Sequence, residues 1–411
     1  MAFTFLHTAD WHLGKRLHGT ELADDHERFF EWLVATVKER QVKLVLISGD
    51  VFDLANPSSE ARRQYYEVVL ALHREGCQVV VTGGNHDSPM VLNAPKALLR
   101  ALNVSVVGGM PEQPAEVLVP VVAADGDTVA VVAAIPYLRD ADLRHGVDRQ
   151  SAEDRVEAVR HGIARIFQAV AEEAAASYPG IPLVGMGHLF AHGAETSDSE
   201  REIQVGNLAD FHARQFPEAY HYLALGHIHR PQQIGGTDRI QYSGSPIGLS
   251  FSERNDHKRV VLGTIAAGKV SVESLPIPEF RKLLRLRGPL AKLREGLTDL
   301  NPDPKALPTL IEMECVEDRR DPQTIYDLEE LVANFAHPNA RIVKYRVQFA
   351  DQVSGANQLY TEGEHIQDLQ PREVFERLLE REAPAESTRT KLLQAFEVVL
   401  EEVYAEMKDE A

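Results

Sequence analysis

Five apolar runs of strand length end in side chains that can hold metal ions, each beside a glycine or another small residue. They are Asp10 and His12 in HTADWH, Asp50 in ISGD, Asn85, His86 and Asp87 in GGNHD, His188 in GMGH, and His227 and His229 in LGHIH. Glycine lets the backbone turn sharply and lets a ligand approach. Because sites in open α/β sheets form at the carboxyl ends of strands, we expect these side chains to gather at one edge.

The chemistry of this set points to transition-metal ions. Neutral imidazole suits Mn, Fe, Co, Ni and Zn, whereas carboxylate and amide oxygens suit harder ions such as Mn and Mg. The set holds more ligands than one ion needs, so it predicts two ions bridged by a carboxylate, an arrangement that serves phosphate-ester hydrolysis. No cysteine belongs to the set, which argues against a structural zinc site.

Each motif alone has an ordinary structural explanation. Asn and Asp favour turns, so GNHD by itself could be a turn. His227 and His229 lie two residues apart on one face of a predicted strand, which also occurs by chance. The metal-site hypothesis therefore rests on all five strand ends occurring together.

The elements that must position these residues alternate in type up to about Pro278. The apolar runs are TFLH, VKLVLISGD, CQVVVTGG, TVAVVAAIP, IPLVGMGH, YHYLALGH and RIQYSGS. Several are apolar on both faces, as in a sheet covered on both sides. Amphipathic helices lie between them, for example HERFFEWLVATVKER. This alternation predicts a layered α/β domain over residues 1–278.

The pattern changes after residue 278. Residues 279–365 read as strand, helix, strand, helix and strand, beginning with RKLLRLRG, and predict a small α+β domain. Residues 366–411 predict two short amphipathic helices. The second of them is acidic and carries an apolar stripe of Leu392, Leu393, Phe396, Val399, Leu400, Val403 and Met407. Such a stripe packs either on the second domain or on a partner protein.

Composition bounds the class of protein. The chain has 411 residues, which suggests two or three domains, and 43 Lys and Arg against 62 Asp and Glu give a net charge of -19. That charge argues against a nucleic-acid partner, although bound metal ions offset it locally. Two distant cysteines, no signal peptide and no apolar run near 18 residues predict a cytoplasmic protein with no membrane contact.

The ordered motifs DWH, GDVFD, GNHD, GH and GHIH resemble the calcineurin-like metallophosphoesterase superfamily over the first two-thirds of the chain. HTADWHLGK, GDVFDLANPS and YSGSPIGLSF resemble, within it, the SbcD family of bacterial nuclease subunits. The resemblance implies an α/β fold: a layered β-sandwich flanked by helices, a small α+β capping domain and C-terminal amphipathic helices.

The resemblance also implies residue roles around two divalent ions, most often Mn²⁺. A first ion would be held by Asp10, His12 and His229, a second by Asn85, His188 and His227, and both would be bridged by Asp50. His86 would lie beside the scissile phosphate, stabilise charge in the transition state, and protonate or orient the leaving oxygen. Asp87 either orients its neighbours or stabilises the turn.

Three positions near these ligands are open to interpretation. Archaeal and eukaryotic relatives carry a second active-site histidine three residues after the bridging aspartate, where this chain has Asp53. A second imidazole-assisted step is therefore not expected here. Lys15 and Arg16 either contact phosphate or form a solvated basic pair.

By resemblance, the function is that of a Mn-dependent DNA nuclease, with double-strand exonuclease and single-strand or hairpin endonuclease activity in DNA repair, recombination and replication. The implied partners are DNA, a second copy of the chain, and a coiled-coil ATPase of the SbcC type, which forms a heterotetramer with that homodimer and is gripped by the C-terminal stripe. The chain has no GxxxxGK[ST] motif, so ATP dependence would come from the ATPase.

Two other hypotheses remain at this level. Another phosphoesterase of the superfamily, acting on non-DNA phosphoesters, is favoured by the charge of -19. A scaffold with a purely structural metal site is opposed by the intact ligand set and His86.

Overall fold

The computed structural model describes residues 3–123, 125–143, 152–200, 211–266 and 268–349, together with five single positions further on. The chain divides into two compact units. The larger contains Met1–Leu286, Leu300–Glu312 and Phe335–Lys344, and the smaller contains Arg287–Asp299, Met313–Asn334 and Tyr345–Ala411. The predicted C-terminal helices over 366–411 fall almost entirely outside the described residues.

The first sheet of the larger unit has six strands in the order β14-β13-β1-β4-β5-β6. Their bounds are β1 Phe3–Thr8, β4 Leu44–Ser48, β5 Gln78–Thr82, β6 Val104–Val107, β13 Arg259–Ala266 and β14 Lys269–Pro276. Strands β1, β4, β5 and β6 are parallel, and β13 and β14 form an antiparallel ladder beside β1. The carboxyl ends of β1, β4 and β5 therefore meet at one edge.

The second sheet also has six strands, in the order β11-β12-β10-β9-β8-β7. Their bounds are β7 Leu118–Val122, β8 Thr128–Ala134, β9 Leu183–His188, β10 Tyr220–Gly226, β11 Gln232–Gln233 and β12 Ile240–Tyr242. Strands β8, β9, β10 and β12 are parallel to one another. Strands β6, β7, β11, β13 and β14, which complete the sheets, were not predicted from the sequence.

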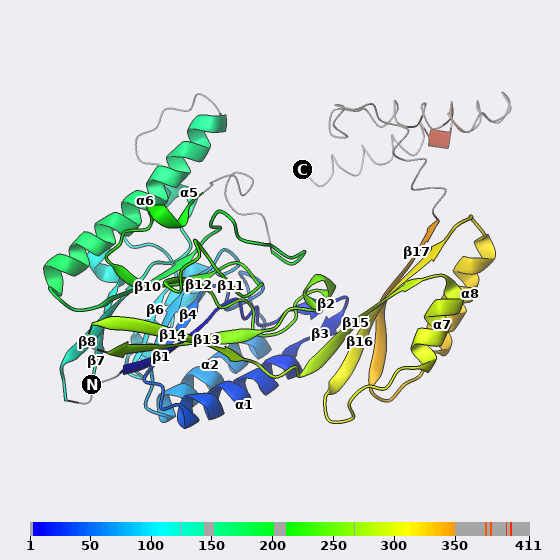
Figure 1. Ribbon diagram of the computed structural model, residues 1–411, viewed down its shortest axis with the longest axis horizontal. Helices are drawn as coiled ribbons and strands as arrows, with labels where there is room; N and C mark the ends of the chain where they lie inside the picture. The colour runs from blue at the N-terminus through cyan, green and yellow to red at the C-terminus, as the bar shows by residue number, and fades with distance from the viewer. Residues whose placement is uncertain are drawn as a thin grey trace. The chain divides into compact units, whose positions relative to one another are not determined.

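The two sheets pack face to face, and helices cover their outer sides (Figure 1). Along β4, Leu44 and Leu46 enter the core between the sheets, while Val45 and Ile47 enter a second core beneath the helices. Helices α1 (Ala23–Glu39) and α2 (Ser59–Arg74) close that second core, and α6 (Ala152–Ser177) packs on the second sheet. Two covered faces explain why the strand is apolar throughout, and the predicted layered α/β fold is confirmed.

Smaller elements connect these layers. They are β2 Arg16–Leu17, β3 Thr20–Glu21, α3 Pro89–Asn93, α4 Lys96–Arg100, α5 Asp140–Leu143, and 3₁₀ turns at Pro114–Val117, Ala213–Gln215 and Phe251–Glu253. A separate sheet has the order β15-β16-β17 and alternates along the chain with two helices. Its elements are β15 Arg281–Gly288, α7 Leu290–Thr298, β16 Leu307–Glu317, α8 Pro322–Asn334 and β17 Ala340–Phe349, in the predicted order.

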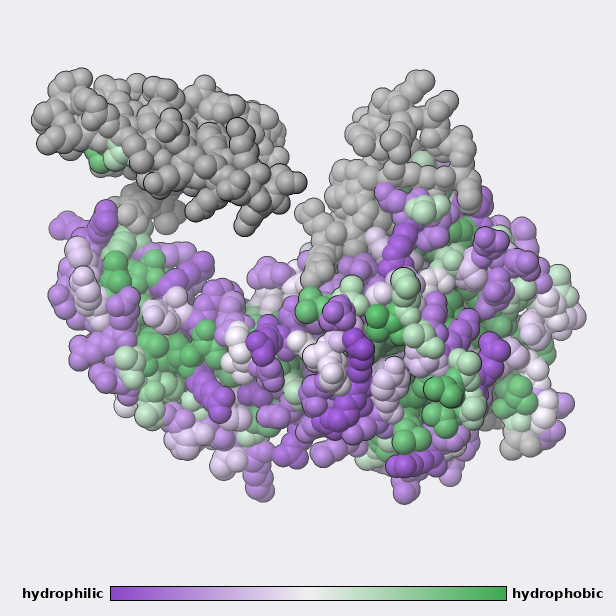
Figure 2. Space-filling model, turned by 180° about the vertical axis from the view of Figure 1, so that it is seen from behind, coloured by the Kyte–Doolittle hydropathy of each residue, from purple (hydrophilic) through white to green (hydrophobic). Residues whose placement is uncertain are grey.

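Polar and apolar side chains are interspersed over the face that Figure 2 shows. Among the described residues, no helix combines the length and the apolar character that crossing a membrane requires.

A buried polar pair links the two sheets close to the strand ends. The hydroxyl of Tyr222 on β10 lies 2.9 Å from Nδ1 of His7 on β1, and both side chains are fully buried. The ring of Tyr222 also packs 5.3 Å from that of Phe5. Because neither polar atom can reach water, the pair favours one relative placement of the sheets.

We expect Tyr222→Phe to lower the free energy of unfolding by about 1–2 kcal/mol, because it leaves His7 Nδ1 buried without its partner. Tyr65→Phe is the matched control, since the buried hydroxyl of Tyr65 has no hydrogen-bond partner among the described residues. Urea unfolding of both variants measures the difference. Equal losses would mean that the pair between the sheets contributes nothing to stability.

His7 should also make stability depend on pH. Burial lowers its pKa to about 3, from 6.5 in an exposed chain. Below pH 6.5 the unfolded chain binds a proton that the folded protein does not, so stability falls as the pH drops from about 6.5 toward 3. Between pH 6.5 and 4.5 this amounts to about 2 kcal/mol, which should be absent in His7→Gln when both are unfolded in urea. Identical pH dependence in the two proteins would contradict a neutral, buried His7.

Candidate metal centre

The structure brings all the predicted site residues together where the strands of both sheets end. Asp10 and His12 follow β1, Asp50 follows β4, Asn85 and His86 follow β5, His188 ends β9, and His227 and His229 follow β10. All are buried except Asn85, which is half-buried. Three overlapping groups among them have ligand atoms close enough to hold an ion: Asp10–His12–His229, His12–Asp50–His86 and Asp10–Asp50–His188.

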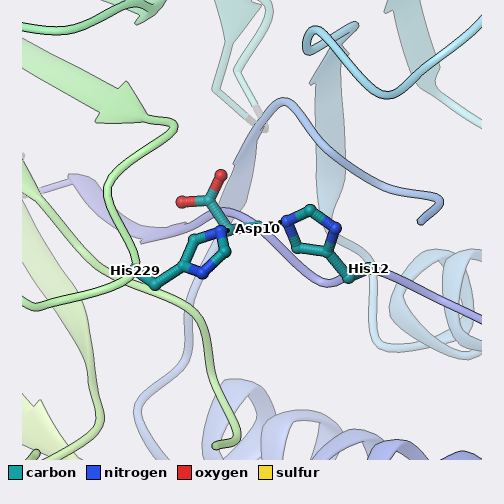
Figure 3. Close-up of side chains that lie close together, drawn as sticks. All are labelled: Asp10, His12 and His229. Atoms are coloured by element: carbon teal, nitrogen blue, oxygen red, sulfur yellow. Dashed lines mark hydrogen bonds between the residues drawn. The ribbon is translucent and has the colours of Figure 1, made fainter. Parts of the chain in front are cut away.

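One side of the cluster is formed by Asp10, His12 and His229, whose side chains converge in Figure 3. Nε2 of His12 lies 3.1 Å from Nε2 of His229. Two imidazole nitrogens this close need either a proton or a cation between them, because both cannot present lone pairs to each other. This geometry fits the predicted first ion position.

The other side is formed around Asn85. Its Oδ1 lies 2.9 Å from Nε2 of His188 and 3.2 Å from Nδ1 of His227. Asp50 lies between the two sides, with Oδ2 3.4 Å from Nε2 of His188 and 3.5 Å from Nε2 of His12. The carboxylate therefore contacts an imidazole of each predicted ion position, as a bridging ligand would.

The backbone at the strand ends is strained. Asp10, His12, Asp50 and His227 have φ angles of 54°, 49°, 48° and 97°, in the region that favours glycine. A non-glycine residue held there costs about 1–3 kcal/mol, and such residues cluster at functional sites. The main chain of the DWH loop is held against the GDV loop, since the amide of His12 donates to the carbonyl of Asp50 over 2.9 Å.

Two of the predicted glycines are needed for close approach. A Cβ on Gly84 would lie 2.1 Å from Oδ1 of Asp50, and a Cβ on Gly49 would lie 2.2 Å from Nδ1 of His188. Gly49 also has φ +85°. Any side chain at these positions would push the strand ends apart, so the glycines allow the ligands to converge.

The electrostatics of the cluster fit bound cations. Burial raises the pKa of Asp10 to about 7. Burial opposes ionisation of Asp50 as well, but His188, His12 and His86 outweigh it and hold the pKa of that carboxyl well below its usual range. Oδ2 of Asp10 and Nε2 of His227 are buried with no hydrogen-bond partner among the described residues. Divalent ions would satisfy both atoms, so the residues fit the group that they are predicted to hold.

Comparisons with known proteins agree with this geometry. The family described as calcineurin-like phosphoesterase matches residues 3–231, and the type 5 capsule protein repressor C-terminal domain matches residues 279–383. The chain is 33% identical to the D subunit of nuclease SbcCD from Escherichia coli K12 over 405 residues, covering 96% of this chain and 97% of that protein. The chain belongs to the SbcD family of calcineurin-like phosphoesterases.

Two further relatives carry the same name. The protein from Rhodobacter capsulatus is 38% identical over 290 residues, 68% of this chain and 71% of that protein. The Bacillus subtilis protein is 33% identical over 259 residues, 62% and 65% of the two chains. Membership of the SbcD family makes this chain a metal-dependent phosphoester hydrolase, as predicted.

His86 and Asp87 have distinct environments in this SbcD-family site. Nδ1 of His86 lies 2.8 Å from the carbonyl oxygen of Asp53, so an N–H at Nδ1 donates there and leaves Nε2 facing the cluster. The carboxylate of Asp87 accepts the backbone amides of Val51, Phe52 and Gly84 at 2.9–3.1 Å. Asp87 therefore ties its own turn to the loop that carries Asp50. It both stabilises the turn and orients its neighbours, the two roles considered from the sequence.

Several residues of the site were not assigned from the sequence. They are Arg139, whose Nη2 donates to the carbonyl of Asp87 over 3.1 Å, Ser199, whose Oγ lies 2.6 Å from Nδ1 of His229, and Glu253 with Lys258 behind Ser199. Asp53 pairs with Lys15 at 3.2 Å and lies 3.3 Å from Nδ1 of His12. Lys15 is therefore paired with a carboxylate beside the metal-capable cluster and is not a solvated cation.

His86 lies in one of the metal-capable groups, so its predicted catalytic role must be distinguished from that of a metal ligand. We expect Asp50→Asn to bind fewer Mn²⁺ ions than the unaltered protein, because a neutral amide bridges two cations poorly. We expect His86→Gln to keep two ions but to lose hydrolysis of bis(p-nitrophenyl) phosphate by about 100-fold or more.

Equilibrium dialysis against Mn²⁺ counts the ions in each variant. His161→Gln is the control, because His161 lies on α6 with a side chain that is 75% exposed. If His86→Gln also loses an ion, His86 is a ligand and its assigned catalytic role is wrong.

Proposed function

We propose that this chain is a Mn-dependent DNA nuclease that hydrolyses phosphodiesters at a two-metal site. The observation that carries the proposal is the buried Asp50 carboxylate, which lies 3.4–3.9 Å from Nε2 of His12, His188 and His86. A ligand set that mixes imidazole nitrogens with carboxylate and amide oxygens suits Mn²⁺ better than a set of oxygens alone.

In this mechanism a first ion would be held by Asp10, His12 and His229 and a second by Asn85, His188 and His227, and Asp50 would be shared between them. When bound, the ions would supply Lewis acidity toward the phosphodiester and a nucleophile at neutral pH. The protein supplies the positions, since strained turns and two covered sheets hold the ligands rigidly before substrate arrives.

His86 completes the mechanism by acting on the leaving group. Its ring is oriented by the hydrogen bond to the carbonyl of Asp53, and its backbone amide donates to Oδ1 of Asp50 over 2.9 Å. Nε2 then stands 3.9 Å from Oδ2 of Asp50, at the edge of the predicted metal centre. From there it can stabilise negative charge on the phosphoryl group or protonate the departing oxygen.

The choice of DNA as substrate is supported by the relatives, which are named nucleases, the Escherichia coli protein matching nearly the whole chain. We propose double-strand exonuclease and single-strand or hairpin endonuclease activity, in DNA repair, recombination and replication. The net charge of -19 favours the alternative, a phosphoesterase that acts on non-DNA phosphoesters, because DNA-binding proteins usually carry basic surfaces.

The proposed assembly is supported by the relatives' names as well, since these describe one component of a complex called SbcCD. In it, residues 1–278 form the nuclease domain, 279–365 a capping domain that recognises DNA ends, and 366–411 the helices that dock on an SbcC-type coiled-coil ATPase. The chain would act in the cytoplasm as a homodimer within a heterotetramer. A match of the second family over residues 279–383 supports a distinct C-terminal part.

The test is cleavage of labelled duplex, hairpin and single-stranded DNA with Mn²⁺, with and without the coiled-coil ATPase, beside bis(p-nitrophenyl) phosphate. We expect the unaltered protein to cut DNA and His86→Gln to cut at least about 100-fold more slowly. Hydrolysis of the small diester without DNA cleavage in either condition would favour the non-DNA phosphoesterase.

A further inference from the structure

Glu253 is a buried carboxylate outside the ligand set. It is 2% exposed and lies in the 3₁₀ turn at the end of the YSGSPIGLSF segment. Moving a carboxylate out of water costs several kcal/mol unless hydrogen bonds and an opposite charge compensate it. Its side chain therefore needs a set of partners, and those partners indicate what it does.

The compensation for Glu253 is extensive. Lys258 Nζ donates to Oε2 over 2.6 Å, and the hydroxyl of Ser245 and the amide of Leu249 donate to the same oxygen over 3.2 Å. The other oxygen, Oε1, accepts from three serine hydroxyls: those of Ser199, of Ser197 over 3.2 Å and of Ser250 over 3.4 Å. The YSGSPIGLSF segment and Lys258 thus surround one ionised carboxylate, and Ser199 is one of the hydroxyls that donate to it.

Ser199 connects this carboxylate to a predicted metal ligand. Its Oγ lies 2.6 Å from Nδ1 of His229, while Oε1 of Glu253 is itself 3.5 Å from that nitrogen. The hydroxyl of Ser199 has one proton and donates it to the carboxylate, so it can only accept a hydrogen bond from His229. Nδ1 of His229 therefore carries the proton. Nε2 is then the free lone pair, and it points at Nε2 of His12, 3.1 Å away.

The same loops also hold the backbone of His229. The amide of His229 donates to Oε1 of Glu200 over 2.8 Å. The carbonyl of His229 accepts from the amide of Ser245 over 3.1 Å and from Lys258 Nζ over 3.2 Å. Both the position of the main chain and the orientation of the ring are therefore set by residues around Glu253.

At the second ion position, the described residues support His188 through a different contact. Nδ1 of His188 lies 3.0 Å from the carbonyl oxygen of Ser48, a neutral acceptor. A carboxylate behind an imidazole raises its basicity more than a carbonyl does, because the negative charge stabilises the polarised ring. The two ion positions are thus supported differently, which supplies an internal comparison.

We propose that Glu253 is a positioning residue for the metal centre, acting through Ser199 to hold His229 in the Nδ1–H form with Nε2 turned to the first ion position. This inference rests on the proposed two-metal site. It assigns to the YSGSPIGLSF segment the task of carrying that carboxylate.

The test uses the full-length protein with Glu253→Gln and Ser199→Ala, titrated with Mn²⁺ alone and followed by calorimetry and by electron paramagnetic resonance of bound Mn²⁺. We expect the affinity of one of two ions to fall about 10- to 100-fold in each variant, with the other unchanged. Nitrogen NMR of the metal-free protein should show His229 protonated at Nδ1 in the unaltered chain, and a mixture of tautomers in the variants.

Glu312→Gln is the matched control. Glu312 is 3% exposed and pairs with Arg285 and Lys344 on the small sheet, outside every metal-capable group in the described part of the chain. The change should lower stability, because it breaks a buried ion pair, without altering Mn²⁺ affinity. Should Glu253→Gln fail to fold, Ser199→Ala keeps the Glu253–Lys258 pair and still tests the connection.

Other outcomes separate this inference from the proposed function. Unchanged Mn²⁺ binding, or equal weakening of both ions, in folded variants would overturn the role of Glu253. If the unaltered protein binds fewer than two ions, the two-metal function fails, whereas the tautomer of His229 in the metal-free protein still decides whether Glu253 orients the ring.

Discussion

The site depends on the contacts that the buried carboxylate of Asp50 makes with both sheets. Asp50 follows β4 of the first sheet, and its carboxylate lies 3.4 Å from His188, which ends β9 of the second sheet. A buried carboxylate is costly unless charged or polar partners surround it, so the strand ends of both sheets must reach it together. The site is therefore complete only when the two sheets are packed together.

That convergence is achieved with strained backbone and with glycines that admit no side chain. The strain at Asp10, His12, Asp50 and His227 costs free energy, which the apolar cores on both sides of the first sheet offset. The polar pair of His7 and Tyr222 is a further buried link between the two sheets. A rigid frame of this kind suits a site whose ligands must be in place before substrate arrives.

Around the metal-capable residues lies a layer of carboxylates, each with a separate task. Asp87 ties two loops through backbone amides, Asp53 stands between Lys15 and His12, and Glu253 reaches His229 through Ser199. Much of the acidity near the site is thus internal and already paired.

The sequence alone determined the layered α/β fold, the helix at α1, the order of elements in the small sheet and the identity of the residues that gather at the strand ends. It could do so because these depend on local signals: apolar periodicity, glycine turns, and the rule that parallel strands present their carboxyl ends together. It missed β6, β7, β11, β13 and β14. It also left two roles open for Asp87, whose amide partners at Val51 and Phe52 lie more than 30 positions away in the chain. Lys15 with Asp53, and Glu253 with Ser199, likewise come together only through folding. No local pattern encodes contacts between residues so far apart, so only the tertiary structure decided which side chains support the metal-capable ones.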